Sequence, residues 1–286
     1  MAELTPMMQK YMETKEQYKD CILFYRLGDF YEMFFDDALV ASKELEITLT
    51  GKSCGLEERA PMCGIPYHAV EGYLSKLVSR GYKVAICEQV EDPKLAKGLV
   101  KREVIRVVTP GTNLNVQSLE AGKNNYLLSI AYTSDGIGIS AADVTTGDYY
   151  VTEVEDLKKL NDELMKYEPS EIICNEAFLV SGFDVNDLKS RLHISVNALE
   201  SHMFDDDGCR RILMKHFRVN TLIGLGVEEF PTGLLAAGAL LQYLYDTQKT
   251  DLEHFTHIYP YLTSKYMLLD SSTRRNLELT ETLREK

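Results

Sequence analysis

Residues 21–35 read CILFYRLGDFYEMFF. Aromatic and aliphatic residues predominate in 21–27 and 30–35, and the pair Gly28-Asp29 separates these two runs. Such residues favour strands, and a glycine-containing pair between two of these runs favours a tight turn. The stretch therefore predicts a β-hairpin, and the fold around it is expected to contain a sheet.

The sequence on both sides of the hairpin alternates between helix and strand signals. Thr5-Pro6 fits a helix start, because threonine caps helices and proline suits the first helical position. Gly81 fits the end of a helix that begins at Val70. The other elements expected in this part are helices at 5–19 and 36–46, a loop at 63–68, and strands at 82–88 and 102–109.

A break at Thr109-Pro110-Gly111-Thr112 and a polar stretch to residue 124 predict a linker. Three strand-like runs then follow, joined by short turns as a meander, and helices alternate with strands after them. The expected elements are strands 126–133, 137–144 and 148–154, helix 156–167, strand 171–174, helix 184–190, strand 192–196 and helix 208–217. This order predicts a layered α/β domain, ribonuclease-H-like in outline.

The last part of the sequence predicts helices. Residues 232–247 are almost wholly apolar and favour a buried helix. A short strand is expected at 266–270 and a helix at 271–285. That last helix reaches Lys286 without a glycine cap, so we expect the chain to be the front of a longer protein.

Composition agrees with a folded protein of two domains and part of a third. The chain has 286 residues, of which 45% are apolar and 26% are charged. Its apolar run at 234–241 is far shorter than the roughly 20 residues that span a bilayer, and the N-terminus has no signal-peptide pattern. The six cysteines form no Cys-x-x-Cys pair, so we expect free thiols in a reducing compartment.

The formal net charge of −13 argues at first against binding to nucleic acid, which usually requires a basic surface. The charge is unevenly distributed, however. Residues 1–115 carry 15 basic and 17 acidic side chains, whereas residues 116–286 carry 16 and 27. The part that contains the hairpin is therefore nearly neutral, and its charge does not exclude DNA.

The second run of the hairpin places an aromatic ring near a carboxylate. Side chains alternate between the faces of a strand, so Phe30 and Glu32 share one face and lie roughly 7 Å apart. A carboxylate is seldom buried without a partner, so this face should be at least partly open. An ordinary strand end, with Phe30 under a loop and Glu32 solvated, is the alternative interpretation.

The chain resembles a known family, the MutS family of bacterial DNA mismatch-recognition proteins. The resemblance covers nearly the whole chain and is carried by several stretches together. These stretches are Thr5–Met8, Phe24–Glu32, Gly64–Val70, Val84–Gln89, Arg106–Thr112, Gly224–Val227 and Leu269–Glu278.

The resemblance implies an α/β multidomain architecture. A mixed-sheet α/β mismatch-binding domain is expected at 1–115 and a linker at 116–124. A ribonuclease-H-like α/β connector domain is expected at 125–230, and the start of an α-helical core or lever domain at 231–286.

The resemblance also implies roles for Phe30 and Glu32, which match the family's Phe-x-Glu motif. Phe30 is expected to enter the minor groove and stack on a mispaired base, and Glu32 to hydrogen-bond that base. Discrimination of this kind depends on how easily the duplex deforms, because a mismatch lowers the cost of unstacking.

A run of basic residues follows the strand expected at 82–88. It consists of Lys94, Lys97, Lys101, Arg102 and Arg106, opposed between 94 and 106 only by Glu103. Phosphate contact is the functional interpretation, and a solvated surface is the alternative.

Two other kinds of site are conceivable but are not favoured by the sequence. Asp143, Asp148 and Glu171 suggest a metal-dependent, ribonuclease-H-like nuclease, but a turn at Thr146-Gly147 explains the first two equally well. A zinc site would need an unusual ligand spacing; its candidates are Cys54, Cys63, His68 and Cys87. A non-DNA-binding interaction scaffold is the third alternative.

The sequence has no Gly-x-x-x-x-Gly-Lys-[Ser/Thr] motif, so we expect no enzyme activity and no cofactor in this chain. The resemblance places ATP and Mg²⁺ in a C-terminal region that the chain lacks, together with the family's dimer contacts. The fragment alone is expected to be monomeric and cytoplasmic, near the nucleoid, with no membrane contact.

The resemblance further implies that mismatched double-stranded DNA and a MutL-type repair protein are the partners. Helix 208–217, with Arg210, Arg211 and His216, is the candidate docking surface for MutL. Arg211-Ile212 are not the amide residues that the family pattern leads us to expect there, which weakens this assignment.

Overall fold

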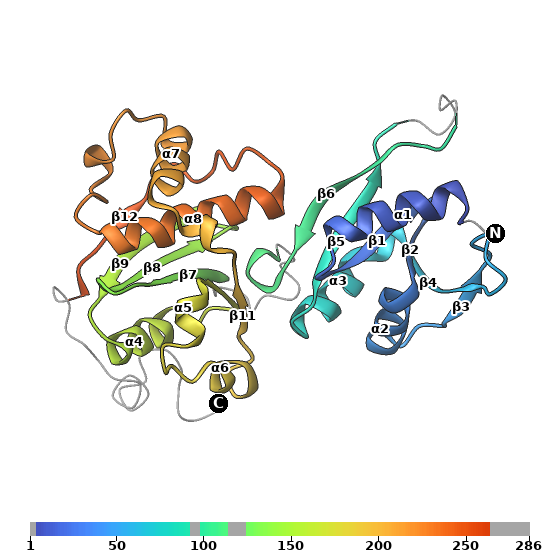
Figure 1. Cartoon of the computed structure of the whole chain (residues 1–286), viewed down its shortest axis with the longest axis horizontal. Helices are drawn as coiled ribbons and strands as arrows, with labels where there is room; N and C mark the ends of the chain where they lie inside the picture. The colour runs from blue at the N-terminus through green and yellow to red at the C-terminus, as the bar shows by residue number, and fades with distance from the viewer. Residues whose placement is uncertain (1–3, 92–97, 114–123, 264–286) are drawn as a thin grey trace, which may run out of the picture. The chain divides into compact units, whose positions relative to one another are not determined.

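The computed structural model describes residues 4–91, 98–113 and 124–263 (Figure 1). These residues form two compact units. The first contains the described residues up to 113 together with 244–251, and the second contains 124–243 together with 252–263.

The first unit is a six-stranded mixed sheet in the order β3-β4-β2-β1-β5-β6. Its strands are β1 (Cys21–Leu27), β2 (Phe30–Phe34), β3 (Thr50–Lys52), β4 (Ala60–Pro66), β5 (Lys83–Gln89) and β6 (Arg102–Val108). Its helices are α1 (Pro6–Gln17), α2 (Phe35–Leu45) and α3 (Val70–Ser79), with short 3₁₀ turns η1 (Tyr67–Ala69) and η2 (Pro110–Thr112).

The predicted hairpin is confirmed. Strands β1 and β2 pair antiparallel, with Leu27 opposite Phe30 and only Gly28-Asp29 between them. Gly28 has a φ of 59°, a backbone conformation that glycine adopts without strain at the first position of a two-residue hairpin loop. Phe30 is therefore the first residue after the tightest kind of hairpin turn.

The prediction of a loop at 63–68 is wrong for Cys63–Pro66, because these residues belong to strand β4. Strand β4 pairs antiparallel with β2, and the edge strand β3 pairs with β4 in turn. Pro61, Gly64 and Pro66 are turn-forming residues, so the sequence of this segment disguises a strand. Pairing with β2, far away in sequence, overrides this local preference.

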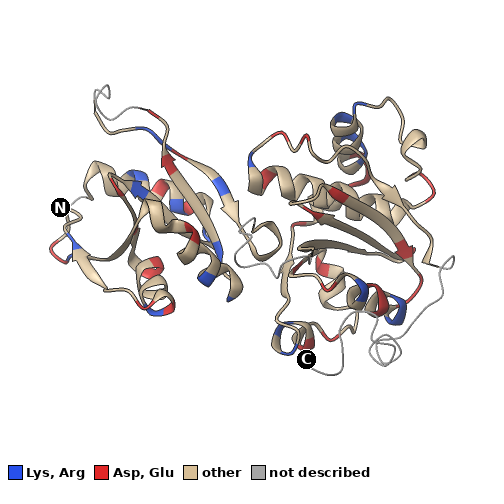
Figure 2. Cartoon of the chain, turned by 180° about the vertical axis from the view of Figure 1, so that it is seen from behind, with Lys and Arg blue, Asp and Glu red and all other residues tan. Residues whose placement is uncertain are grey.

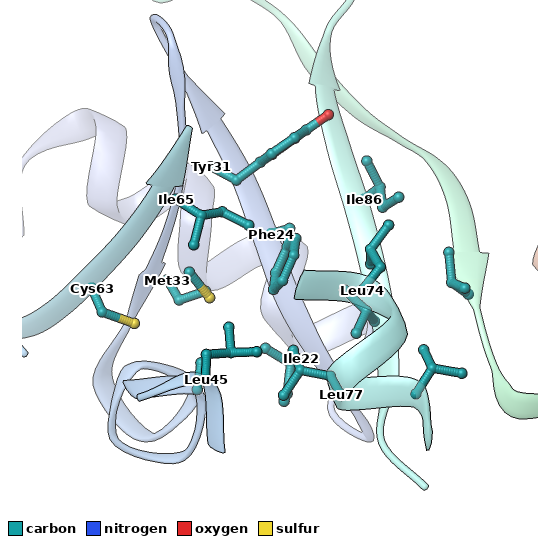
Figure 3. Close-up of a cluster of buried hydrophobic side chains, with 14 of the residues drawn as sticks. Ile22, Phe24, Tyr31, Met33, Leu45, Cys63, Ile65, Leu74, Leu77 and Ile86 are labelled. Atoms are coloured by element: carbon teal, nitrogen blue, oxygen red, sulfur yellow. The ribbon is translucent and has the colours of Figure 1, made fainter. Parts of the chain in front are cut away.

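Two hydrophobic layers cover the sheet of the first unit. Helix α1 packs on one face, where Tyr11 meets Phe34 at 4.9 Å between ring centroids. Helices α2 and α3 pack on the other face, where Figure 3 shows Phe24, Tyr31 and Met33 pointing into one cluster. The two faces of β2 are therefore both buried at its Phe34 end.

The second unit is a six-stranded sheet in the order β11-β10-β7-β8-β9-β12. Its strands are β7 (Tyr126–Tyr132), β8 (Ile137–Asp143), β9 (Asp148–Val154), β10 (Glu171–Cys174), β11 (Ser195–Ala198) and β12 (Tyr259–Pro260). Its helices are α4 (Leu157–Tyr167), α5 (Glu176–Leu179), α6 (Val185–Ser190), α7 (Asp206–Phe217) and the part of α8 (Pro231–Gln248) up to residue 243, with 3₁₀ turns η3 (Ser201–Phe204) and η4 (Ile223–Leu225).

The strand order of the second unit confirms the predicted layered α/β domain. Strands β7, β8 and β9 form the antiparallel meander, and β10 and β11 run parallel to β7 beyond it. Helices α4, α5 and α6 cover one face of the sheet. Helices α7 and α8 lie over the other face (Figure 1). The strand expected at 192–196 forms three residues later, at 195–198.

Helix α8 packs directly on the sheet of the second unit. The Glu153 carboxylate on β9 accepts hydrogen bonds from the backbone N–H groups of Thr232 and Gly233, at 2.5 and 3.0 Å. The Tyr149 hydroxyl donates to the carbonyl of Ala237. The first turns of α8 therefore belong to the second unit.

The strand expected at 266–270 and the helix expected at 271–285 lie outside the described residues. Within the described ranges, no helix is both long and apolar enough to cross a membrane. All six cysteines are free thiols, as the sequence predicts, and the structure shows that all six are buried.

Candidate nucleic-acid interface

Phe30 lies at the open end of the face that α1 covers. It is 47% exposed, whereas Phe34, on the same face of β2, is buried. The two residues are four positions apart, or about 13 Å along a strand, so the cover that Tyr11 gives Phe34 does not extend to Phe30. The predicted opening of this face is confirmed, and it presents an aromatic ring to solvent.

Glu32 lies between Phe30 and Phe34 and is held by a lysine. The Nζ of Lys52, on β3, is 2.5 Å from Oε2 of Glu32, and the Glu32 side chain is only 16% exposed. The same ammonium lies 5.5 Å from the centre of the Phe34 ring. Sequence reasoning missed Lys52, because the β3–β4 pairing that brings it to β2 carries no clear signal.

Gly64 leaves space beside both predicted site residues. It lies opposite Glu32 in the β2–β4 pair, and a Cβ placed on it would be 3.6 Å from Cγ of Glu32 and 3.9 Å from Cδ1 of Phe30. Any side chain longer than alanine at this position would compete with them for the same volume. The absence of a side chain at Gly64 thus leaves that volume to Phe30 and Glu32.

On the β1 side of Glu32, the same face of the sheet carries Tyr25 and then Arg102. Tyr25 is opposite Glu32 on β1, and the Arg102 guanidinium of β6 lies 5.3 Å from its ring centre. Arg102 also donates to the carbonyls of Arg26 and Val100, at 2.7 and 2.8 Å. Burial raises the pKa of Tyr25, and the charge of Arg102 partly opposes that rise. Lys52 therefore contacts the Glu32 carboxylate directly, whereas Arg102 lies on the same face but beyond Tyr25, on a strand that is not adjacent to β2.

A polar cluster on the opposite face fixes the turn before Phe30. The Arg26 guanidinium lies 3.7 Å from the centre of the Tyr67 ring and 3.3 Å from the Glu88 carboxylate, and its Nε donates to the carbonyl of Gly28 at 2.5 Å. The Tyr31 hydroxyl, at the edge of the cluster in Figure 3, donates to Glu88. Burial and this hydrogen bond raise the pKa of Tyr31, which keeps it a donor at neutral pH.

The basic run predicted from the sequence is divided between the two faces of the unit. Basic and acidic positions alternate along the β5–β6 hairpin (Figure 2), and the exposed Lys101 pairs with Glu103 at 2.6 Å. A shift in register between Ile86 and Cys87 marks an irregularity in the β5–β6 ladder, which lets Arg102 and Arg106 face opposite sides although their spacing is even. Lys94 and Lys97 lie outside the described residues.

Arg106 has a structural partner. Its Nη2 donates to the carbonyl of Thr112 at 2.9 Å, and the residue is half-buried. This bond ties β6 to the Pro110–Thr112 turn. Of the described members of the basic run, Arg102 is the one on the face of Phe30.

Asp143 and Glu171, two of the carboxylates considered for a nuclease site, accept hydrogen bonds within the fold. Asp143 accepts from the backbone and hydroxyl of Thr145, at 2.8 and 2.6 Å, and from the backbone of Asn125. Glu171 accepts from Asn197 and Tyr243, at 3.0 and 2.8 Å. Across the part of the chain that the structure describes, no three His, Cys, Asp or Glu side chains gather as metal ligands.

Helix α7, the candidate docking surface, uses some of its basic residues within the fold. Arg210 pairs with Asp206 and Glu228, at 2.8 and 2.9 Å, and a ring nitrogen of His216 lies 2.8 Å from the carbonyl of Phe255. Arg211 is exposed.

Comparisons with known proteins agree with the two-unit division. Residues 5–117 match the family model for MutS domain I, and residues 125–256 match the model for MutS domain II. The chain is 68% identical to the DNA mismatch repair protein MutS of Lachnoclostridium phytofermentans, over the whole chain and 31% of that relative. It is 53% identical to the proteins of the same name from Ruminiclostridium cellulolyticum and Acetivibrio thermocellus, again over the whole chain and 33% of each relative. The chain thus spans about a third of the length of the curated relatives that it matches.

Proposed function

The chain belongs to the MutS family, and from this premise we propose that its first unit recognises mismatched and unpaired bases in double-stranded DNA. Phe30 enters the minor groove and stacks on a mispaired base, and Glu32 forms a hydrogen bond with that base. The observation that carries the proposal is the half-exposed Phe30 ring beside the Glu32 carboxylate, just after a two-residue turn.

Wedge binding explains how a unit without a large basic surface can select DNA. Inserting an apolar side chain between base steps costs a few kcal/mol of unstacking, and a weakly paired site reduces that cost. The base gains stacking on the ring, worth about 1–3 kcal/mol. The preference for a mismatch therefore comes from the deformability of the duplex, and Glu32 adds a contact to the displaced base.

Phosphate contacts would add affinity without adding discrimination. Arg102 fits this role through its place on the face of Phe30, and the exposed Lys101 immediately precedes it in the chain. Lys94, Lys97 and Arg106 stay predictions from the sequence.

The second unit has no catalytic arrangement in this proposal. We assign it to the connection between the mismatch-binding unit and the remainder of a MutS protein, with a MutL-type repair partner docking on it. ATP, Mg²⁺ and the homodimer contacts belong to the parts of the relatives that this chain does not match. A nuclease activity is not favoured, because Asp143 and Glu171 are used as hydrogen-bond acceptors inside the fold.

The proposal is tested by measuring binding to a duplex with one G·T mispair and to its matched control over a range of salt concentrations. Two proteins are compared: the chain alone, and a chimera in which the chain replaces the matching part of a full-length relative. We expect the chimera to prefer the mispair by about tenfold or more, from the stacking energy of one base. Equal affinity for both duplexes at every salt concentration would contradict the proposal and favour the scaffold alternative.

Replacing Glu32 with glutamine should blur discrimination while keeping or tightening binding to DNA. The substitution leaves the Lys52 ammonium without its counter-charge, so the site gains positive charge toward the phosphates, and it preserves the size of the side chain. We expect the affinity for the matched duplex to rise and the ratio of mismatched to matched affinity to fall. A uniform loss of affinity for both duplexes would show that Glu32 is not a base contact.

A further inference from the structure

The Lys52–Glu32 ion pair couples the proposed base-reading carboxylate to an edge strand. Nζ of Lys52 and Oε2 of Glu32 are 2.5 Å apart, and the two side chains are 33% and 16% exposed. This partial burial distinguishes the pair from most surface ion pairs, whose partners are freely solvated and contribute little. Among the described residues, Lys52 is the base that pairs with Glu32.

The position of Lys52 on β3 and the contacts of its ammonium define the geometry of the ion pair with Glu32. Lys52 lies opposite Ala60 on β4, so its side chain must cross β4 to reach β2. Its ammonium lies 5.5 Å from the ring centre of Phe34, and that ring is fixed by Tyr11 from α1. With its ammonium beside the Phe34 ring and 2.5 Å from Oε2, Lys52 holds one oxygen of the Glu32 carboxylate.

An isolated carboxylate at this place would work against DNA binding. Glu32 is two residues from Phe30 on the same face of β2, so a duplex that receives the Phe30 ring brings its phosphates close to Glu32. The pair with Lys52 has no net charge, and this removes the repulsion. Because the ammonium contacts Oε2, Oε1 is the oxygen that remains for a base.

We propose that Lys52 is a positioning residue for mismatch discrimination: it holds the Glu32 carboxylate beside Phe30 and cancels its charge against the phosphates. This inference rests on the proposed function of the first unit. Lys52 acts through Glu32 and carries no separate contact to the DNA backbone.

The competing role, a direct phosphate contact, makes a different prediction. A lysine that binds a phosphate contributes equally to matched and mismatched duplexes, and its loss reduces the slope of log affinity against log salt by about 0.9. A positioning residue instead affects the ratio of the two affinities, and only while residue 32 is a carboxylate.

The test is a double-mutant cycle in the chimera, with Lys52→Met, Glu32→Gln and both substitutions together. We expect Lys52→Met alone to lower the ratio of mismatched to matched affinity by about fivefold, the upper end for a partly exposed ion pair. In the Glu32→Gln background, the same substitution should change that ratio less than about twofold. Lys52→Arg should keep most of the ratio, because a guanidinium also pairs with a carboxylate.

Lys83→Met is the matched control. Lys83 pairs with Asp20 at 3.0 Å and lies opposite Cys21, at the far end of the strands from Phe30. Its replacement removes the same charge from the same unit, and we expect no change in the ratio. Far-UV circular dichroism and thermal unfolding of each variant show whether the sheet is intact.

Two results would overturn the inference. One is an equal loss on both duplexes with a smaller salt slope, which assigns Lys52 to a phosphate. The other is a fall in the ratio that is as large in the Glu32→Gln background as in the unsubstituted one. Failure of the proposed function has a separate signature, because the unsubstituted chimera would then show no preference for the mispair.

Discussion

Replacing Phe30 with alanine is expected to abolish the preference for a mispaired duplex. The residue is 47% exposed, so removal of its ring takes away the proposed stacking surface without opening the core. Stacking of one base on an aromatic side chain is worth about 1–3 kcal/mol, which corresponds to a loss of roughly 5- to 150-fold in affinity. We expect this loss on the G·T duplex and a change of less than about threefold on the matched duplex, which does not accept the wedge.

Leu39→Ala is the matched control for this prediction. Leu39 is also 47% exposed, but it lies on α2, which covers the opposite face of the sheet. Its replacement removes exposed apolar surface from the same unit, and both affinities should stay unchanged. Phe30→Leu separates two contributions, because leucine can wedge between base steps but cannot stack as an aromatic ring. An equal loss on both duplexes after Phe30→Ala would make Phe30 a general contact instead.

The position of Phe30 could be predicted because it depends on local sequence. Gly28-Asp29 sets a two-residue loop, the loop sets the first residue of β2, and the alternation of a strand places Phe30 with Glu32. The helices that begin at Pro6, Phe35 and Val70 depend on equally local signals. None of these steps requires knowledge of a distant partner.

The surroundings of Glu32 could not be predicted in this way. Lys52 is 20 residues from Glu32 and reaches it only because β3 and β4 join the sheet, and Gly64 and the prolines of β4 conceal that strand. Arg102 and Arg106 face opposite sides of the sheet because the β5–β6 pairing shifts register, and the alternation of side chains along a strand does not reveal such a shift. Pairing between strands distant in sequence therefore decides which charges surround the site.

A second large effect is expected at Asp37, which joins three elements of the first unit. Its carboxylate accepts from the backbone N–H of Leu23 on β1 and from Nζ of Lys15 on α1, both at 2.9 Å, and from the Tyr11 hydroxyl at 3.3 Å. The residue itself is on the first turn of α2 and is 8% exposed. Burial and the charge of Asp37 raise the pKa of Tyr11, so Tyr11 remains a donor to this carboxylate.

Replacing Asp37 with alanine leaves the N–H of Leu23 without its acceptor, and leaves the Lys15 ammonium with only the carbonyls of Cys21 and Lys19 among the described residues. We expect this loss of hydrogen bonds and charge pairing at Leu23 and Lys15 to lower the free energy of unfolding of the first unit by about 2–4 kcal/mol. Because the chain has two units, a single unfolding transition is not assured, and local amide hydrogen exchange is the better measurement.

The expected result for Asp37→Ala is faster exchange throughout β1 and α1, by about 30-fold or more, since about 1.4 kcal/mol is a factor of ten. The amides of β7 and β8, in the second unit, should keep their protection. Asp36→Ala is the control, because Asp36 is exposed on the same turn of α2. If both substitutions speed exchange alike, the buried network around Asp37 does not hold α1 on the sheet. The packing of Tyr11 on Phe34 would then have to hold it alone.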